Sequence, residues 1–383
     1  MSLAFSRTPV ALALLGLASA VSAPVQAAEF KAGDVDLTLA GIVNAYYTTT
    51  SCSGDQTITG AALAGKALGC SGKDGTTTIG NGLLPNALTV GAKMKQDGLD
   101  IGATIMIGSA VASNSAIGAN SAVDVRQGFL TFGNAGMGTV KIGRDYGMFG
   151  ANAILGDMTL IGAGAPVNAT QSNRVTLGHI GAGYSYLGTY GQLAYTAPAM
   201  GGVTLSGALV SPVDADATHV SDKSPQVQVQ VSLALPAGKA WVSAKTQKFN
   251  GTGAAVDFTM SGVEVGTSYS LGAFSVLANL QSGKGLGVLA DGDNGDQKQT
   301  ATLVQATFQA TPKVKLGVNY GITRLKDTAG PALKDNSNVT GGMYYGLTKS
   351  VTLVGETSQT KSKAANGASA KMTGLALGAI LFF

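Results

Sequence analysis

The residues that decide the fold are the last ones in the chain, Lys371 to Phe383, which read KMTGLALGAILFF. Apolar side chains recur at every second position from 375 to 383, and small residues such as Gly374 and Gly378 interrupt what would otherwise be a continuous apolar run. Successive side chains of a β-strand point to opposite faces, so this spacing predicts a strand with one apolar face and one face of little bulk. The rest of the chain must supply the strands that pair with it.

The first residues have the pattern of a secretory signal peptide. Arg7 supplies a positive charge, residues 10–21 are apolar, and Val25-Gln26-Ala27 forms a small-residue cleavage site. We therefore predict a signal peptide over residues 1–27 and a single mature domain over residues 28–383. The formal net charge of +4 is a weak bias, so no nucleic-acid partner is expected.

The composition of the chain is unusual for a soluble protein. Hydrophobic residues make up 45% of it, charged residues only 12%, and there are 55 glycines. No stretch after the signal peptide approaches the ~18 apolar residues that a membrane-spanning helix needs, and a soluble globule needs more charge than this to stay dispersed. The same composition fits a β-barrel whose outer face meets lipid, because glycine serves in tight turns and close strand contacts.

The two cysteines, Cys52 and Cys70, lie in one polar segment rich in glycine and threonine. In an exported chain this arrangement predicts a disulfide, which would stabilise the fold by roughly 3 kcal/mol. The alternative is a pair of free thiols in a loop. The spacing does not match a zinc site and neither histidine is near it, so no metal or cofactor is expected.

Sixteen segments have the length and alternation of β-strands. Asp97-Gly98 is a strong hairpin signal between two of them, and the segment 226–233 alternates glutamine or serine with valine or leucine. The predicted strands are residues 36–48, 87–96, 99–109, 122–132, 138–144, 188–197, 203–211, 226–233, 239–249, 257–270, 274–282, 299–310, 313–325, 337–347, 351–360 and 371–383.

The connections between these strands alternate between long and short ones. Odd-numbered connections are long and even-numbered ones are short, as in barrels with external loops on one side of a membrane and tight periplasmic turns on the other. A closed barrel also leaves no unpaired strand edge in lipid. We therefore predict an all-β protein, a 16-stranded antiparallel transmembrane β-barrel.

Several segments carry a family resemblance. The terminal strand ending in Phe383 is similar to the last strand of Gram-negative outer-membrane barrels. Residues 138–147 (GTVKIGRDYG) resemble the motif that enters the long third loop of Gram-negative general diffusion porins. Residues 125–130 (VRQGFL) resemble the preceding strand of that family, and residues 195–202 (YTAPAMGG) resemble a later turn. The resemblance extends over essentially the whole mature chain.

The resemblance implies a homotrimer of water-filled barrels in the cell outer membrane, in contact with outer-membrane lipid and lipopolysaccharide. It also implies that the third loop folds into the lumen. In many members cationic wall residues face acidic loop residues across this constriction, and by position Arg126 and Arg144 match the family's arginines. The loop departs from the family pattern, because Asp157 is the only acid between positions 148 and 165.

Charged residues near the third loop are the candidates for a pore constriction, since a channel selects by its radius and by the charges that line it. If Val140 and Ile142 face lipid, Lys141 faces the lumen, whereas Arg144 has the outward parity unless a bulge redirects it. The alternative is that these charges are solvated at the rim. The predicted constriction residues are Arg126, Lys141, Arg144, Asp145, Asp157 and Arg174.

The remaining motifs do not indicate other chemistry. The run from Asp291 to Asp296 superficially resembles a calcium loop but lacks the required ligands, so a solvated external loop is expected. His179 and His219 are expected to be ordinary loop residues, and no Ser/His/Asp arrangement indicates an enzyme. The predicted function is an outer-membrane porin for passive diffusion of small hydrophilic solutes and ions. The alternatives are a substrate-specific channel and a non-conducting structural or adhesin barrel.

Overall fold

The computed structural model describes residues 27–55, 57–59, 74–109, 123–164 and 176–383. The predicted signal peptide, Cys70 and Arg174 lie outside these residues, except for Ala27 at the end of the signal peptide. Within the part of the chain that is described, no helix has the length and apolar composition needed to cross a bilayer.

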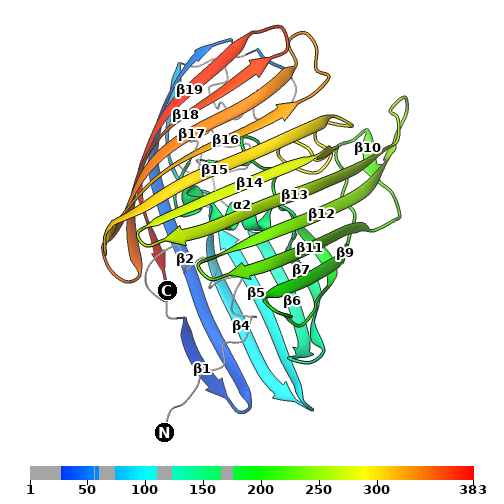
Figure 1. The fold of residues 1–383 in the computed structure, drawn as a ribbon, viewed down its shortest axis with the longest axis vertical. Helices are drawn as coiled ribbons and strands as arrows, with labels where there is room; N and C mark the ends of the chain where they lie inside the picture. Colours follow the sequence, from blue (N-terminus) through cyan, green and yellow to red (C-terminus); the bar gives the residue numbers. More distant parts are fainter. Residues whose placement is uncertain (1–26, 56, 60–73, 110–122, 165–175) are drawn as a thin grey trace.

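Sixteen antiparallel strands pair in sequence order around a closed ring, so the predicted 16-stranded antiparallel barrel is confirmed (Figure 1). Strands β2, β17 and β18 are longer than predicted. The sixteen are β2 (Val35–Gly54), β4 (Asn86–Gln96), β5 (Leu99–Ser109), β6 (Asp124–Asn134), β7 (Gly138–Tyr146), β8 (Thr189–Thr196), β9 (Val203–Val210), β11 (Gln226–Leu235), β12 (Gly238–Gly251), β13 (Phe258–Leu271), β14 (Phe274–Lys284), β15 (Lys298–Thr311), β16 (Val314–Leu325), β17 (Leu333–Gly346), β18 (Val351–Ala364) and β19 (Ser369–Phe382).

The barrel closes where the last strand meets the first long one. Strand β19 pairs with β2 from Ala370 opposite Gly54 to Phe382 opposite Ile42. The terminal residue continues this ladder, because the Phe383 amide donates to the Gly41 carbonyl at 3.0 Å and the Gly41 amide donates to the Phe383 carbonyl at 2.7 Å. A side chain at position 41 would collide with the Phe383 ring in its present position, so glycine there lets the ring pack against the seam.

Three short strands were not predicted, and each extends an existing hairpin. Strand β1 (Ala28–Ala32) pairs with the first residues of β2. Strand β3 (Gly75–Gly80) pairs with the other half of β2, and β10 (His219–Ser221) pairs with the end of β12. Strand β2 has 20 residues, more than the ~9–11 that span a bilayer, so its excess length is available for β1 and β3.

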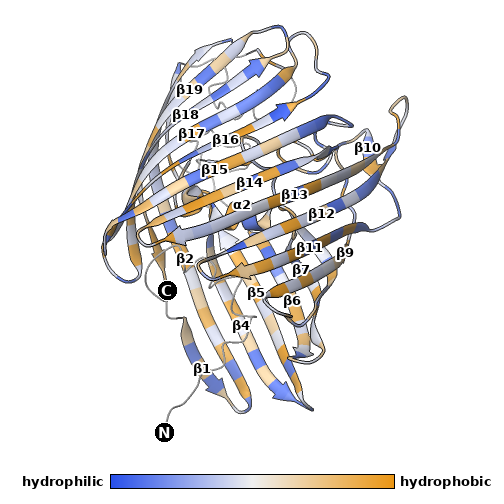
Figure 2. Cartoon of the chain, in the orientation of Figure 1, coloured by the Kyte–Doolittle hydropathy of each residue, from blue (hydrophilic) through white to orange (hydrophobic). Residues whose placement is uncertain are grey.

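Hydrophilic and hydrophobic residues alternate along the strands of the barrel wall (Figure 2), and burial assigns them to opposite faces. On β11, Gln226 and Gln228 are buried inside the barrel while Val227 and Val229 are exposed on the outside. Every backbone polar group in lipid must be satisfied internally, which the closed ladder achieves, and the outward side chains then provide the apolar surface. Outward apolar residues from around the ring include Val43, Val90, Ile105, Leu130, Leu193, Leu209, Val229, Val242, Val265, Val276, Val304, Val318, Val339, Leu353 and Leu377.

The described residues between β7 and β8, 147–164 and 176–188, lie in the interior of the barrel. This segment contains the helix α2 (Ala151–Gly156) and the 3-10 helix η3 (Met158–Ile161). Its apolar residues pack against inward residues of the wall, for example Ile154 and Leu160 in one cluster with Trp241 and Leu277. The core therefore lies between the inner face of the wall and this loop.

Adjacent residues on β5 test the assignment of the two faces. Ile105 is exposed on the outside and Thr104 is half-buried on the inside at the same depth. We expect Ile105→Arg to lower the free energy of unfolding by about 2–4 kcal/mol, because it places a charge against lipid near mid-barrel. Thr104→Arg is the matched control and should cost much less. The measurement is urea unfolding in lipid vesicles, and equal losses in the two variants would contradict the assignment.

Candidate pore constriction

The third loop, described over residues 147–164 and 176–188, enters the barrel directly after β7 and returns to β8. The Gly147 amide donates to the Gly188 carbonyl at 3.2 Å, which holds the two ends of the loop together. Part of its described backbone is hydrogen-bonded within the loop, for example in α2, where the Ile154 amide donates to the Gly150 carbonyl at 3.1 Å. Other backbone amides and carbonyls bond to polar side chains that point inward from the wall strands.

The first anchors lie on β11 and β13. The Gln228 Oε1 atom accepts from the backbone amides of Met148 at 2.7 Å and Phe149 at 3.2 Å. The Glu264 Oε2 atom accepts from the Gly150 amide at 3.0 Å. Gly150 caps α2 in the left-handed region at φ 83°, a conformation that glycine adopts without strain.

The middle anchor is Gln305 on β15, whose amide group clamps the junction between the two helices. Its Oε1 atom accepts from the Met158 amide at 2.6 Å, and its Nε2 atom donates to the Gly156 carbonyl at 2.9 Å. One side chain thus satisfies an orphan donor and an orphan acceptor of the loop at once.

The far anchor is Glu356 on β18, whose side chain is only 2% exposed. Its carboxylate accepts from the Ala163 amide at 2.7 Å, the Gly164 amide at 2.6 Å and the Tyr344 hydroxyl at 2.6 Å. On β2, the Tyr46 hydroxyl donates to the Ile161 carbonyl at 2.6 Å. Hydrogen bonds to an ionised acceptor are the stronger kind, which makes Glu356 the principal anchor at this end.

Asp157 holds the loop to itself and to the wall. It is 3% exposed and accepts from the Thr159 amide at 2.9 Å, the Tyr184 hydroxyl at 2.8 Å and Asn319 Nδ2 on β16 at 3.0 Å. The Nδ1 atom of His179 lies 3.1 Å from its Oδ2 atom. Burial alone would raise the pKa of Asp157, but the attraction of His179 and these hydrogen bonds hold the pKa below its ordinary value.

Asp157 was predicted to line the constriction, and the structure places it in this buried group instead. The reason is the concentration of donors around it, which satisfy the carboxylate away from water. His179 was expected to be an ordinary loop residue. It lies in the loop, fully buried against Asp157.

Lys141 and Asp145 form the ionic pair that faces the loop from β7. Lys141 lies opposite the inward Thr131 of β6, and its ammonium group pairs with the Asp145 carboxylate. Asp145 also accepts from Gln127 Nε2 at 2.8 Å. The Lys141 side chain is 25% exposed, so this pair is open to water to a degree that the loop anchors are not.

Arg126 faces inward because of a bulge in β6. Strand β5 pairs Met106 with Gln127 and Ile107 with Val125, so Arg126 is the extra residue in the ladder. The bulge lets Arg126 and its neighbour point to the same side. Its guanidinium bonds to Asp124 at 2.6 Å and to the Tyr186 hydroxyl of the third loop at 3.1 Å.

Arg144 does not join this group. It is exposed with outward parity, and it donates to the Val125 carbonyl and to Thr189 Oγ1, each at 3.1 Å. The bulge that was expected to redirect it occurs at Arg126 on the neighbouring strand. Of the predicted constriction residues, the structure therefore brings together Lys141 and Asp145 and places Arg126 on the adjacent strand, while Arg174 lies outside the described residues.

The anchors Gln228, Glu264, Gln305 and Glu356 were not predicted as functional residues. The alternation of the sequence does indicate which face they occupy. Glu264, for example, lies between Val263 and Val265 in an alternating strand, which assigns it to the lumen. The sequence contains no signal for which loop amides donate to each anchor, because these amides are far away in the chain.

Two further observations concern predicted sites. Cys52 is disulfide-bonded, and because Cys70 lies outside the described residues its pairing with Cys52 stays a prediction. Among the residues that the structure describes, no group of three or more His, Cys, Asp or Glu could hold a metal ion.

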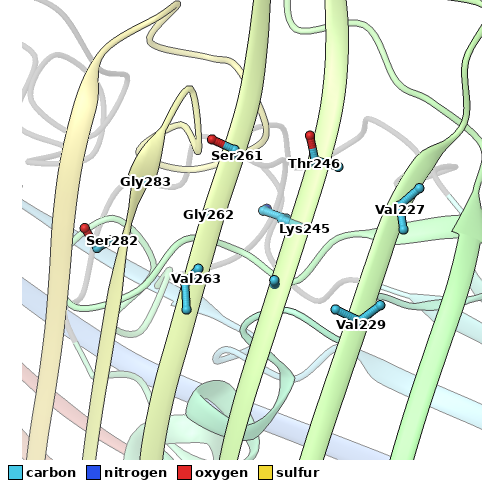
Figure 3. A pocket seen from close by; sticks show the side chains of 10 residues that line it. Val227, Val229, Lys245, Thr246, Ser261, Gly262, Val263, Ser282 and Gly283 are labelled. Carbon is cyan, nitrogen blue, oxygen red and sulfur yellow. The ribbon is translucent and has the colours of Figure 1, made fainter.

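A shallow hollow lies on the outer face of the wall over β11 to β14 (Figure 3). Its lining combines outward Val227, Val229 and Val263 with small residues such as Thr246 and Ser261. It opens away from the lumen and is not part of the constriction.

A closed barrel with a long loop anchored inside it defines an outer-membrane channel for passive diffusion. The chain belongs to the Gram-negative porin family, whose family model matches residues 11–365. The chain is thus an outer-membrane protein of the multi-strand barrel type. No curated protein matches it in sequence.

Solved structures with the same fold include three outer-membrane proteins. The outer-membrane channel DcaP of Acinetobacter baumannii is 17% identical, with a TM-score of 0.67, over 93% of this chain and 100% of that one. An anion-selective porin from Comamonas acidovorans is 16% identical, with a TM-score of 0.63, over 91% and 100%. The trimer form of OmpT from Vibrio cholerae is 14% identical, with a TM-score of 0.57, over 91% and 99%. At these identities the likeness establishes the fold alone.

Glu356→Ala tests the principal anchor of the third loop. The substitution leaves two loop amides and the Tyr344 hydroxyl without their acceptor, so we expect the free energy of unfolding to fall by about 3 kcal/mol or more. Hydrogen exchange at Ala163 and Gly164 should accelerate. Ser358→Ala is the matched control, because the Ser358 hydroxyl lies two residues along the same face and has no hydrogen-bond partner among the described residues. Unchanged exchange in Glu356→Ala would contradict the anchoring role.

The pKa of Asp157 predicts a pH dependence of stability. An aspartate whose pKa is lowered by folding stabilises the protein above its unfolded pKa, and this contribution is lost as the pH falls through the folded pKa. We therefore expect the free energy of unfolding to decrease below pH ~4 in the wild type, and less steeply in Asp157→Asn. The exposed turn residue Asp34 supplies the control Asp34→Asn, which should follow the wild type. Parallel urea-unfolding curves for all three proteins from pH 7 to 2 would refute this account.

Proposed function

We propose that the channel works as a homotrimer, passes small hydrophilic solutes and ions, and has a weak preference for anions. We also propose that it carries out no catalysis. The proposal concerns selectivity and assembly, since the family and fold already define the channel itself.

The observation that carries the anion preference is that Lys141 keeps access to water while the acids bonded to the third loop do not. Glu264, Glu356 and Asp157 are almost fully buried and are occupied by donors of the third loop and the wall. Lys141 retains access to water at 25% exposure. A charge acts on a passing ion only when it lines the water-filled path, so the accessible cation outweighs the buried acids.

The preference is expected to be weak, because Lys141 is paired with Asp145. In the neighbouring pair the acid is the accessible partner, since Asp124 is 41% exposed and Arg126 is 9% exposed. Partial neutralisation of each cation by its partner reduces the field that a solute experiences. The fold shared with the anion-selective porin of Comamonas acidovorans supports a diffusion channel. The preference for anions is argued from the accessibility of Lys141.

Two other parts of the proposal rest on separate observations. A similar structure is described as a trimer form, and the outward apolar residues provide a surface for lipid, lipopolysaccharide or a neighbouring barrel. For catalysis, His179 pairs with Asp157, but its Nε2 atom has no hydrogen-bond partner among the described residues. A general base must reach the proton of a substrate, and the fully buried imidazole of His179 offers a solute no access.

Planar-bilayer recordings of two charge reversals test the selectivity. Lys141→Glu should shift the reversal potential in a salt gradient toward cations, with the anion-to-cation permeability ratio falling roughly twofold or more. Arg144→Glu is the matched control, since Arg144 lies three residues away on the same strand with outward parity, and its reversal potential should equal that of the wild type. A reversal potential that shifts in Arg144→Glu but not in Lys141→Glu would contradict the proposed role of Lys141.

The same recordings separate the alternatives. Ohmic steps in groups of three support the trimeric open channel. Silence from correctly folded protein supports a structural barrel, and a saturable block by one solute supports a substrate-specific channel.

A further inference from the structure

The connection between β14 and β15, residues 285–297, turns into the barrel. Leu286 and Val288 are fully buried and Asp291 is 4% exposed. Gln299, on the inward face of β15, donates from Nε2 to the Gly287 carbonyl at 2.8 Å. The prediction of a solvated external loop covered Asp291 to Asp296, and it is wrong for Asp291 and Gly292, which are buried.

A buried ionic pair holds the segment to the wall. The Lys245 ammonium, near the middle of β12, bonds to Asp291, and the two side chains are each 1% exposed. The same carboxylate accepts from Gln226 Nε2 at 2.8 Å and from the Tyr190 hydroxyl at 2.9 Å. A buried ion pair is tolerated only when further hydrogen bonds complete it, and these two donors from β11 and β8 do so.

The segment is also folded tightly within itself. The Asp293 carboxylate accepts from the amides of Val288, Leu289 and Ala290 at 2.7, 2.8 and 2.9 Å. The Gly292 amide donates to the Gly285 carbonyl at 3.0 Å. These bonds make the segment compact, so the ion pair of Lys245 and Asp291 can hold it in place as one unit.

The segment contacts the third loop directly. The Tyr186 amide of the third loop donates to the Leu289 carbonyl at 3.1 Å. Phe149 of the third loop packs in one buried cluster with Leu286, and its ring lies 4.8 Å from the Lys245 ammonium. Lys245 thus touches both inward segments.

We infer that residues 285–297 form a second pore-narrowing loop, and that Lys245 and Asp291 are the positioning residues that hold it inside the barrel. The inference rests on the proposed function, since it assigns to this loop a share in setting the size limit of the channel. Breaking the pair leaves a buried charge without its counter-charge. The loop then has to move outward so that water can reach the remaining group, and the pore widens.

The variants are Lys245→Met, Asp291→Asn and the double substitution Lys245→Met/Asp291→Leu. The matched controls are Lys284→Met and Asp296→Asn, because Lys284 and Asp296 form an ion pair at 2.9 Å at the ends of the same segment with side chains 43% and 51% exposed. Single-channel conductance measures the width of the pore, and swelling of liposomes in sugars of increasing size measures its size limit. Hydrogen exchange of residues 286–293 reports attachment of the loop.

Each variant of the buried pair should raise the conductance by about 1.3-fold or more, admit a larger sugar and accelerate exchange in the loop. The double variant leaves no buried charge, but it removes the acceptor of the Gln226 amide and the Tyr190 hydroxyl. Buried donors without an acceptor are costly, so this variant should also release the loop, and its effect should not be the sum of the single ones. The exposed-pair controls should behave as the wild type. Folding is verified by heat-modifiable migration in gels, and the double variant, which leaves no unpaired buried charge, carries the test if a single variant fails to fold.

Folded variants with wild-type conductance, size limit and exchange would overturn the inference. Faster exchange with unchanged conductance and size limit would also overturn it, because the loop would then be attached as inferred without narrowing the pore. Silence of the wild type itself would instead overturn the proposed channel, and the exchange data would still decide whether the pair holds the loop.

Discussion

The structure depends on one constraint, which is that backbone N–H and C=O groups inside a membrane have no water to bond with. The sixteen strands satisfy this constraint by closing on themselves, and the seam is the place where closure has to be achieved by the chain ends. Strand β19 completes the ladder with β2, and the last residue, Phe383, continues it by exchanging two hydrogen bonds with Gly41. The aromatic ring of Phe383 then occupies the space that a side chain at position 41 would need.

The same requirement explains the arrangement inside the barrel. A loop that leaves the ladder carries unpaired amides and carbonyls, and burial of such groups is costly unless each finds a partner. Gln228, Glu264, Gln305 and Glu356 supply the partners from four different strands. These side chains consequently do not line the solute path. The charges that act on a passing ion are those that remain in contact with water, such as Lys141.

The sequence was sufficient to predict the strands of the barrel wall but not the contacts of the loops inside the barrel. Alternation with period two is a local property, so it located all sixteen strands and placed Lys141 on the inner face. It placed Asp157 at the constriction and not in a buried group. It gave Arg144 outward parity that a bulge or the loop could redirect, whereas the bulge occurs at Arg126 on the neighbouring strand. It also left Asp291 in solvent, although the partner of Asp291 is Lys245, 46 positions earlier in the chain. Contacts of this kind depend on which strands become neighbours of a loop, and no local pattern records them.

The central claim is that one face of each strand touches acyl chains and the other encloses the polar interior. Spin labels placed singly along β11 in lipid vesicles test it most directly, with the native disulfide left intact. The account predicts that labels at the outward positions Val227, Val229 and Val231 are accessible to oxygen and shielded from a water-soluble nickel complex, while labels at the inward positions Gln230 and Ser232 are shielded from oxygen. Accessibility that does not alternate along the strand, or high nickel accessibility at the valine positions, would contradict it.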